Sequence, residues 1–137
     1  MPKNDGKTVN ASGKHDFARA NAAVKLGSGK VTINSVPLEI IRPSLAREKI
    51  REALILADDI AKKVDIKIEV KGGGFMGQAI ASRLAIARAL VKFSKSEKLK
   101  KTYLDYDRNL LVADVRKRET RKPGPSKARA GAQKSKR

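Results

Sequence analysis

Three glycines offer the most specific chemistry in this sequence. The spacing Gly72-x-Gly74-x-x-Gly77 follows an alternating apolar and charged stretch, residues 66–71, and opens a stretch of helical period, residues 75–93. A strand that turns into a helix through bare backbone points unpaired N–H groups and the positive end of the helix dipole at one place. Such a place suits a phosphate group. The nearby polar side chains that could assist are Lys71, Gln78 and Arg83.

A nucleotide cofactor is one interpretation of these glycines, because their spacing matches the dinucleotide-binding pattern. That pattern requires an acidic residue about 20 positions further on, at the end of the next parallel strand. Residues 93–98 occupy that place and are typical of a helix junction instead. The Gly-Lys-Ser/Thr of a phosphate-loop ATPase is also missing. The loop therefore favours a polynucleotide phosphate and predicts no cofactor, and a nucleotide-binding enzyme that uses Gly72–Gly77 is kept as the alternative.

Few residues are suited to catalysis or metal binding. The chain has no cysteine and a single histidine, His15, which we expect at the surface. Asp58 and Asp59 lie among lysines and are expected to be solvated or ion-paired. Asp107, next to Arg108, is expected to fix the last helix rather than to hold a metal. We therefore predict that the protein is not an enzyme, and we predict no catalytic residue, no metal and no small-molecule substrate.

The net charge of +18 indicates a polyanionic partner, with nucleic acid first and an acidic membrane second. Residues 116–137 hold ten of the 32 Lys and Arg residues but only one of the 14 acids. Ordering such a segment costs on the order of 20–40 kcal/mol of backbone entropy, at about 1–2 kcal/mol per residue. No side chain there is apolar and larger than alanine, so packing cannot offset that cost.

This segment is therefore expected to be an extended basic tail, mobile when free and ordered only against a polyanion. Fully extended, it would reach roughly 70–80 Å. Its prolines, glycines and isolated cations suit the irregular crevices of RNA better than duplex DNA. A generic basic protein that compacts nucleic acid remains a second alternative.

The rest of the chain predicts a single α+β domain. Residues 17–25 and 30–34 have strand character around a hairpin turn at 27–29, and residues 36–41 suggest a short edge segment. A helix is expected over 44–63, with Ser44 as its cap, and a shorter basic helix over 95–103. Residues 110–113 form a last apolar anchor.

We therefore divide the chain into a flexible lead-in, a globular RNA-binding domain and the tail, over residues 1–15, 16–115 and 116–137. No apolar run approaches the roughly 20 residues of a membrane span, and no secretory signal is present. An intracellular protein without membrane contact is expected.

Five segments of the chain form a distinctive set: Val70-Lys71-Gly72-Gly73-Gly74-Phe75-Met76-Gly77-Gln78-Ala79, Ala85-Ile86-Ala87-Arg88-Ala89-Leu90, Tyr106-Asp107-Arg108, Leu111-Val112-Ala113-Asp114 and Gln133-Lys134-Ser135-Lys136-Arg137. Together they resemble the small-subunit ribosomal protein nine family (uS-nine). The stretch from Gly27 to Glu39 fits without gaps, so the resemblance covers about residues 13–137. The Tyr-Asp-Arg and Val-Ala-Asp segments resemble archaeal and eukaryotic members, with a preference for archaeal ones.

The resemblance implies a two-layer ribosomal S5 domain 2-like fold with a left-handed βαβ unit and an extended basic C-terminal tail. It implies a structural role in the cytoplasmic ribosome, in the head of the small subunit. The implied partners are small-subunit rRNA, the anticodon stem-loop of P-site tRNA and neighbouring ribosomal proteins.

Two sets of site residues follow from the glycine loop, the tail and the resemblance. The residues expected to bind rRNA are Lys71, Gly72, Gly73, Gly74, Gln78, Arg83, Arg108, Arg116, Lys117, Arg118, Arg121, Lys122, Lys127, Arg129 and Lys134. The residues expected to bind tRNA are Lys136 and Arg137.

This chain departs from the family pattern at two places. The usual basic opening is replaced by Gly13-Lys14-His15-Asp16-Phe17, and Asn21 stands in place of a usual arginine. The ending lacks the penultimate tyrosine usual in archaea, so a purely ionic contact with tRNA is expected.

Overall fold

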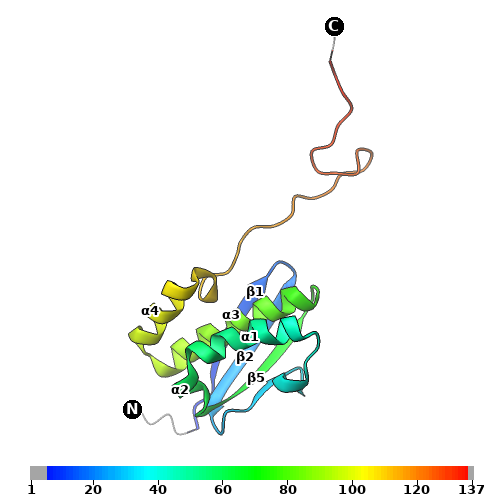
Figure 1. The fold of residues 1–137 in the computed structure, drawn as a ribbon. Helices are drawn as coiled ribbons and strands as arrows, with labels where there is room; N and C mark the ends of the chain where they lie inside the picture. Colours follow the sequence, from blue (N-terminus) through cyan, green and yellow to red (C-terminus); the bar gives the residue numbers. More distant parts are fainter. Residues whose placement is uncertain (1–5, 136–137) are drawn as a thin grey trace.

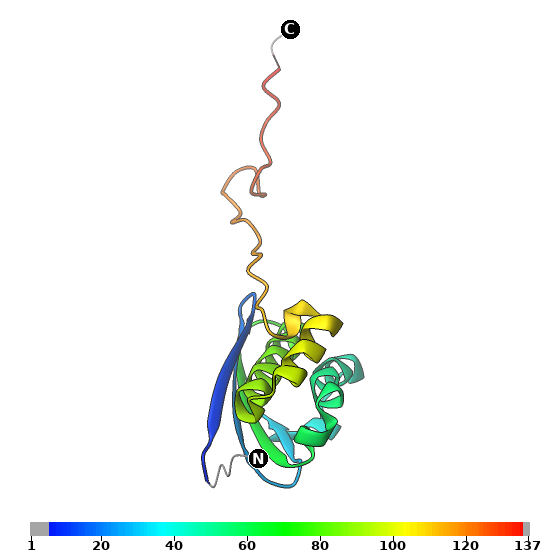
Figure 2. The ribbon, with the colours of Figure 1, turned by 90° about the vertical axis from the view of Figure 1, so that its left-hand side faces the viewer.

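The domain has two layers, a five-stranded sheet and a set of helices packed on one of its faces (Figures 1 and 2). The computed structural model describes residues 6–135. The elements in chain order are β1 (Val9–His15), β2 (Ala18–Leu26), β3 (Val31–Ile33), β4 (Val36–Pro37), the 3-10 helix η1 (Leu38–Ile40), α1 (Ser44–Leu56), α2 (Asp58–Ala61), β5 (Val64–Lys71), α3 (Phe75–Ser94), α4 (Glu97–Tyr106) and the 3-10 helix η2 (Arg108–Leu110). The α+β class predicted from the sequence is confirmed.

The strands follow the order β1-β2-β5-β3-β4, and only the β3–β5 pair is parallel. Strand β5 is therefore central, and its side chains alternate between buried and solvent-facing positions, as the period of residues 66–71 predicts. Its inward residues, from Val64 to Val70, pack with the buried alanines and Val24 of β2 beneath the helices. Each such Val or Ile contributes about 1.5–3 kcal/mol by leaving water.

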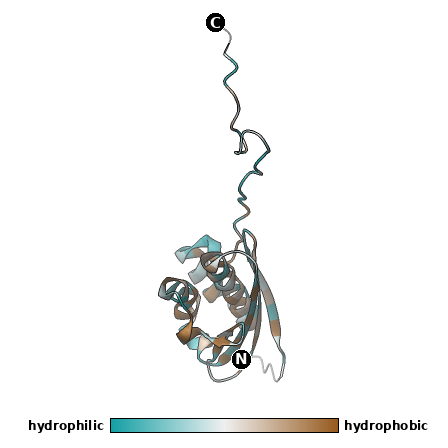
Figure 3. Ribbon diagram, turned by 90° about the vertical axis from the view of Figure 1, so that its right-hand side faces the viewer, coloured by the Kyte–Doolittle hydropathy of each residue, from teal (hydrophilic) through white to brown (hydrophobic). Residues whose placement is uncertain are grey.

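Helix α3 lies across the inner face of the sheet and is buried over most of its surface. Every residue from Ala81 to Ala87 is buried. The small alanine side chains let the helix backbone approach both the sheet and α1. In Figure 3 the apolar colour concentrates in the domain, whereas the chain beyond it is mostly polar. The predicted helix over 75–93 is confirmed.

The first correction concerns the predicted flexible lead-in. Residues Val9–His15 form β1, which pairs with β2 along its whole length. A Cβ on Gly13 would collide with the carbonyl oxygen of Ala81 and lie 2.7 Å from the nitrogen of Ala85, so only glycine lets this strand lie against α3. The strand was missed because asparagine, glycine, alanine and lysine, which make up most of it, are depleted in strands.

The second correction concerns the predicted hairpin at residues 27–29. Strands β2 and β3 are not neighbours, because β5 lies between them. The carboxylate of Asp65 accepts hydrogen bonds from the backbone N–H groups of Ser28 (2.9 Å) and Lys30 (3.1 Å), which fixes the turn to the start of β5 instead. A turn signal specifies a local bend but not the partner of the next strand.

The helix predicted over 44–63 is divided at Ala57, whose φ of −115° and ψ of 33° end α1 before α2 begins. Ser44 is the first residue of α1 rather than its cap, and no side chain caps that end. The shorter helix lies at 97–106, so it begins two residues and ends three residues later than predicted, and it is capped by Ser96. The predicted apolar anchor survives as Leu110, which is fully buried in η2.

Candidate nucleic-acid interface

One end of the domain brings together four segments that are separate in the sequence. The β1–β2 turn, the glycine loop after β5, the start of α3 and the root of the C-terminal segment all lie there, and the chain leaves the domain from this end (Figures 1 and 2). Arg88 holds the root in place, because its Nε donates to the carbonyl of Leu111 (2.9 Å) and its Nη1 to that of Ser12 (3.0 Å). Whatever binds the glycine loop therefore meets the beginning of the C-terminal segment as well.

The glycine loop is shaped by close contact with the β1–β2 turn. Gly72 and Gly73 have φ angles of 80° and 65°, in the left-handed region that favours glycine. A Cβ on Gly72 would also lie 2.5 Å from the carbonyl oxygen of Phe17. The loop residues are exposed, and no side chain caps the N-terminus of α3. Its first N–H groups are therefore open to an anion, as the sequence predicts for a phosphate.

Gln78 and Arg83 behave differently from Lys71, although all three were expected to contact RNA. Lys71 is exposed at the end of β5. The side-chain amide of Gln78 donates to the carbonyl of Gly72 (3.1 Å), so it stabilises the loop from within.

Arg83 is only 3% exposed, and its guanidinium lies 2.8 Å from the Glu52 carboxylate and 3.1 Å from that of Asp107. The structure thus corrects the expectation for this residue, because its charge is already paired inside the domain.

Asp107 joins α4 to the core, as the sequence predicts. Its carboxylate caps η2 by accepting from the N–H of Asn109 (2.9 Å) and also receives Arg83. Burial works against ionisation, but the Asn109 N–H and the Arg83 guanidinium together hold the pKa of Asp107 below its ordinary value. Arg108 follows it and is exposed.

The root of the C-terminal segment carries a local ion pair and a group of cations. The side chain and N–H of Arg116 bind Asp114 and hold the pKa of that carboxyl down to about 2. Lys117 lies close enough to Lys14 of β1 to lower the pKa of the Lys14 ammonium. Arg118 lines the same shallow hollow as His15 and Arg116.

Beyond the root, almost every residue described up to Ser135 is exposed. Glu119 pairs with Arg129 at 2.8 Å. The remaining predicted cations of this segment are Arg121, Lys122, Lys127 and Lys134, and all of them are exposed. Lys136 and Arg137 lie outside the described residues.

The predicted set omits two residues of this end, Lys14 and Arg19. Lys14 of β1 pairs with Arg19 of β2, and Arg19 pairs in turn with Lys71 of β5. The signal that could have found Arg19 is the period-two alternation of β2, which places its side chain on the face of the sheet away from the buried alanines.

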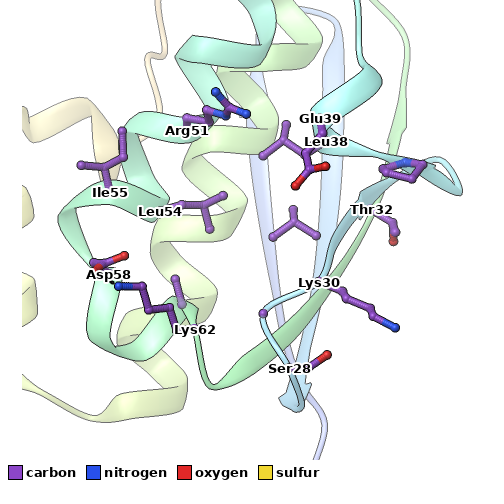
Figure 4. Close-up of a pocket in the computed structure, with 14 residues that line it drawn as sticks. Ser28, Lys30, Thr32, Leu38, Glu39, Arg51, Leu54, Ile55, Asp58 and Lys62 are labelled. Carbon is purple, nitrogen blue, oxygen red and sulfur yellow. Dashed lines mark hydrogen bonds and ion pairs between the residues drawn. The ribbon is translucent and has the colours of Figure 1, made fainter.

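A hollow of about 590 Å³ lies elsewhere, between α1, α2 and β3 (Figure 4). Its labelled apolar residues, Leu38, Leu54 and Ile55, lie among charged side chains, and Lys62 is paired with Asp58. No residue of the glycine loop lines it. Between residues 6 and 135, no helix combines the length and apolar character needed to cross a bilayer.

Comparison with known proteins decides the family. A family model described as ribosomal protein S9/S16 matches residues 13–137. The chain belongs to the ribosomal protein S9/S16 family. A small ribosomal subunit protein uS9 of Methanothrix thermoacetophila is 50% identical over 129 residues, which cover 94% of this chain and 98% of the relative.

Two further archaeal relatives named small ribosomal subunit protein uS9 are each 48% identical over 129 residues, or 94% of this chain. They come from Pyrobaculum aerophilum, with 91% of the relative covered, and Desulfurococcus amylolyticus, with 92%. The predicted family is therefore confirmed, together with its archaeal character. As an S9/S16 protein, the chain is a structural component of the cytoplasmic ribosome and not an enzyme.

Proposed function

We propose that this S9/S16 protein is a constituent of the small-subunit head that binds rRNA through the glycine-loop end and extends its C-terminal segment to P-site tRNA. One observation carries the proposal: the root of a strongly basic, exposed segment lies beside an uncapped helix start and a bare glycine loop. The loop and the helix start offer backbone N–H donors, and the segment offers positive charge. A phosphodiester backbone binds to both kinds of group.

The rRNA contacts we retain come from the loop, η2 and the C-terminal segment. They are Lys71, Gly72, Gly73, Gly74, Arg108, Arg116, Lys117, Arg118, Arg121, Lys122, Lys127, Arg129 and Lys134. Gln78 serves by shaping the loop, and Arg83 is withdrawn. In this proposal, residues 116–137 form a separate tail that is mobile in the free protein and ordered on RNA, and other proteins of the head adjoin the domain.

The tRNA contact is assigned to Lys136 and Arg137, with Arg137 on a phosphate of the anticodon stem-loop. Support comes from the family match, which extends to residue 137. We also propose that the β3–α1–β5 connection is the left-handed crossover of a ribosomal S5 domain 2-like fold. Its support is that β3 and β5 are parallel neighbours with α1 and α2 between them in the chain.

Deleting Lys134–Arg137 tests the tRNA assignment. Small subunits that carry the shortened protein should assemble normally but release P-site tRNA faster than subunits with the full chain. The control is Lys98→Gln, Lys100→Gln and Lys101→Gln together, which removes a similar charge from α4. Unchanged tRNA release from the shortened subunits would refute the assignment.

Membership of the S9/S16 family answers the enzyme alternative that the glycine spacing left open. The generic compacting protein differs from this proposal in what it binds. Such a protein would bind duplex DNA as tightly as small-subunit rRNA at equal salt. Preference for the rRNA would support the proposed rRNA contacts over generic binding.

A further inference from the structure

Three cations stand side by side across the end of the sheet. Lys14 of β1 is directly opposite Arg19 of β2, and Arg19 is directly opposite Lys71 of β5. Cβ atoms of residues that face each other in antiparallel strands lie about 4.5–5.5 Å apart. We call Lys14, Arg19 and Lys71 the cation row.

The row lies on the face of the sheet that the helices leave uncovered. The flanking residues Gly13, Ala18, Ala20 and Val70 are buried on the helix side. Because successive side chains in a strand point to opposite faces, the side chains of the row lie on the other face. Figure 2 shows the helices on one side of the sheet only. A large, flat partner can therefore reach the row without any movement of the domain.

Like charges directly opposite one another destabilise a sheet. Asp16, in the β1–β2 turn, offsets part of the repulsion at Lys14, but it forms no ion pair with the row. None of the ion pairs formed among residues 6–135 includes a member of the row. The next row of the same face is Ser12, Asn21 and Glu69, and the carboxylate of Glu69 lies 3.9 Å from the ammonium of Lys67 instead. The cation row is an arrangement that an external anion would complete.

The surroundings of the row favour a phosphodiester backbone over other anions. The neighbouring residues of β1 and β2 on the open face are Asn10, Ser12, Asn21 and Ala23, which are small or polar, and those of β5 are Lys67 and Glu69. The hollow on this face, which Asn10, Asn21 and Glu69 help to line, is open to solvent rather than enclosed, which does not suit a free nucleotide. Lys117, from the root of the C-terminal segment, lies next to Lys14. An RNA strand that leaves the row would thus meet the C-terminal segment directly.

We propose that Lys14, Arg19 and Lys71 bind the phosphodiester backbone of rRNA as one unit on the open face of the sheet. This inference rests on the proposed function and adds to it a contact surface made by β1 and β2. The row spans three strands, so it can follow one RNA strand across the sheet. Lys117 then continues the same contact into the C-terminal segment.

The test compares two triple variants of the full chain with equal charge. The first is Lys14→Gln, Arg19→Gln and Lys71→Gln, and the control is Lys25→Gln, Lys63→Gln and Lys100→Gln, which are exposed cations away from the row. Binding to a transcript of an archaeal small-subunit rRNA head is measured over a range of salt concentrations. Thermal melting confirms that both variants are folded.

The row variant should bind the transcript at least tenfold more weakly than the control. The slope of log affinity against log salt should be smaller in magnitude by about two. Each phosphate that the protein no longer neutralises removes roughly 0.7–0.9 from that slope. Its melting temperature should not fall, because the removed charges repel one another. Equal losses of affinity in the two variants would overturn the inference.

Two further outcomes would show that the proposed function fails or that the row binds an acidic protein segment instead of RNA. If the unaltered protein binds the transcript no better than a scrambled RNA, the proposed function itself fails. If the row variant binds the transcript normally but no longer binds polyglutamate, the row is a site for an acidic protein segment, and the inference is wrong.

Discussion

Arg83 shows how far the role of one residue depends on its surroundings. Its charge lies in the domain interior between Glu52 of α1 and Asp107 before η2. A buried charge without partners costs several kcal/mol, so the two carboxylates are required by the position of the arginine. The three residues tie α1, α3 and the end of α4 together at one point.

Acid should weaken this connection. The pKa of Asp107 is lower in the folded protein than in the unfolded chain, so its ionised form favours folding. That contribution is complete above about pH 4 and is lost as the pH falls through the folded-state pKa. The melting temperature of Asp107→Asn should therefore change less than that of the unaltered protein between pH 5 and pH 2.

At neutral pH, Asp107→Asn should lower the free energy of unfolding by about 1–3 kcal/mol, since its hydrogen bonds would no longer involve a charged carboxylate. Asp105→Asn, which changes an exposed aspartate on α4, serves as the control. Parallel pH profiles for Asp107→Asn and the unaltered protein would contradict the role given to the Asp107 carboxylate.

Substitution of two glycines should have opposite effects. Gly72→Ala should destabilise the domain by about 1–3 kcal/mol, because the residue has positive φ and its Cβ would meet the carbonyl of Phe17. Gly77→Ala should stabilise it by about 0.5–1 kcal/mol, because Gly77 lies within α3 and its Cβ would make only ordinary contacts. Urea unfolding of both variants measures the difference, and equal effects would refute the strain assigned to the loop.

At the scale of elements, α4 depends on one aromatic residue for its place on α1. Tyr103 is fully buried and donates to the carbonyl of Ala53 at 2.7 Å, and burial raises the pKa of its hydroxyl. Tyr103→Phe should cost about 1 kcal/mol by removing this hydrogen bond. Tyr106→Phe should cost almost nothing, since Tyr106 is 57% exposed. Denaturant unfolding measures both costs, and equal costs for the two variants would disprove the role of Tyr103 as an anchor.

The elements that sequence predicts well are those whose own pattern decides their structure. Strand β5 and helix α3 have clear periods of two and 3.6, and both occur where expected. Strand β1 has no such pattern, because its place depends on the fit of Gly13 against α3, which involves residues some 70 positions away. The neighbour of β3 was also unpredictable, since turn residues specify direction but not pairing.

The candidate site was predictable to a similar extent. The glycine loop and the basic C-terminal segment are local signals, and both stand at the same end of the molecule. Arg83 was misassigned because nothing in its neighbourhood in sequence reveals Glu52 and Asp107 as partners. Lys14 and Arg19 were missed because the role proposed for them comes from register across strands rather than from position along the chain.

At the scale of the whole molecule, the C-terminal segment adds charge to the protein but no buried core. Residues beyond Arg118 contribute no buried apolar side chain among those described. A chain that ends at Arg118 should therefore melt within about 1 °C of the full protein, because it keeps the core and the Asp114–Arg116 ion pair. Its affinity for rRNA should fall and become less sensitive to salt. A large drop in melting temperature would show that the segment packs on the domain.

The central position of β5 also has a consequence for the order of events during synthesis. Strands β1 to β4 emerge first, but the sheet cannot close until β5 enters between β2 and β3. Helix α3, which covers the sheet, follows β5 immediately, so the domain is completed late and within a short length of chain. The basic C-terminal segment is made after it. Every buried apolar residue among those described precedes this densely charged segment, so the core can fold without waiting for it.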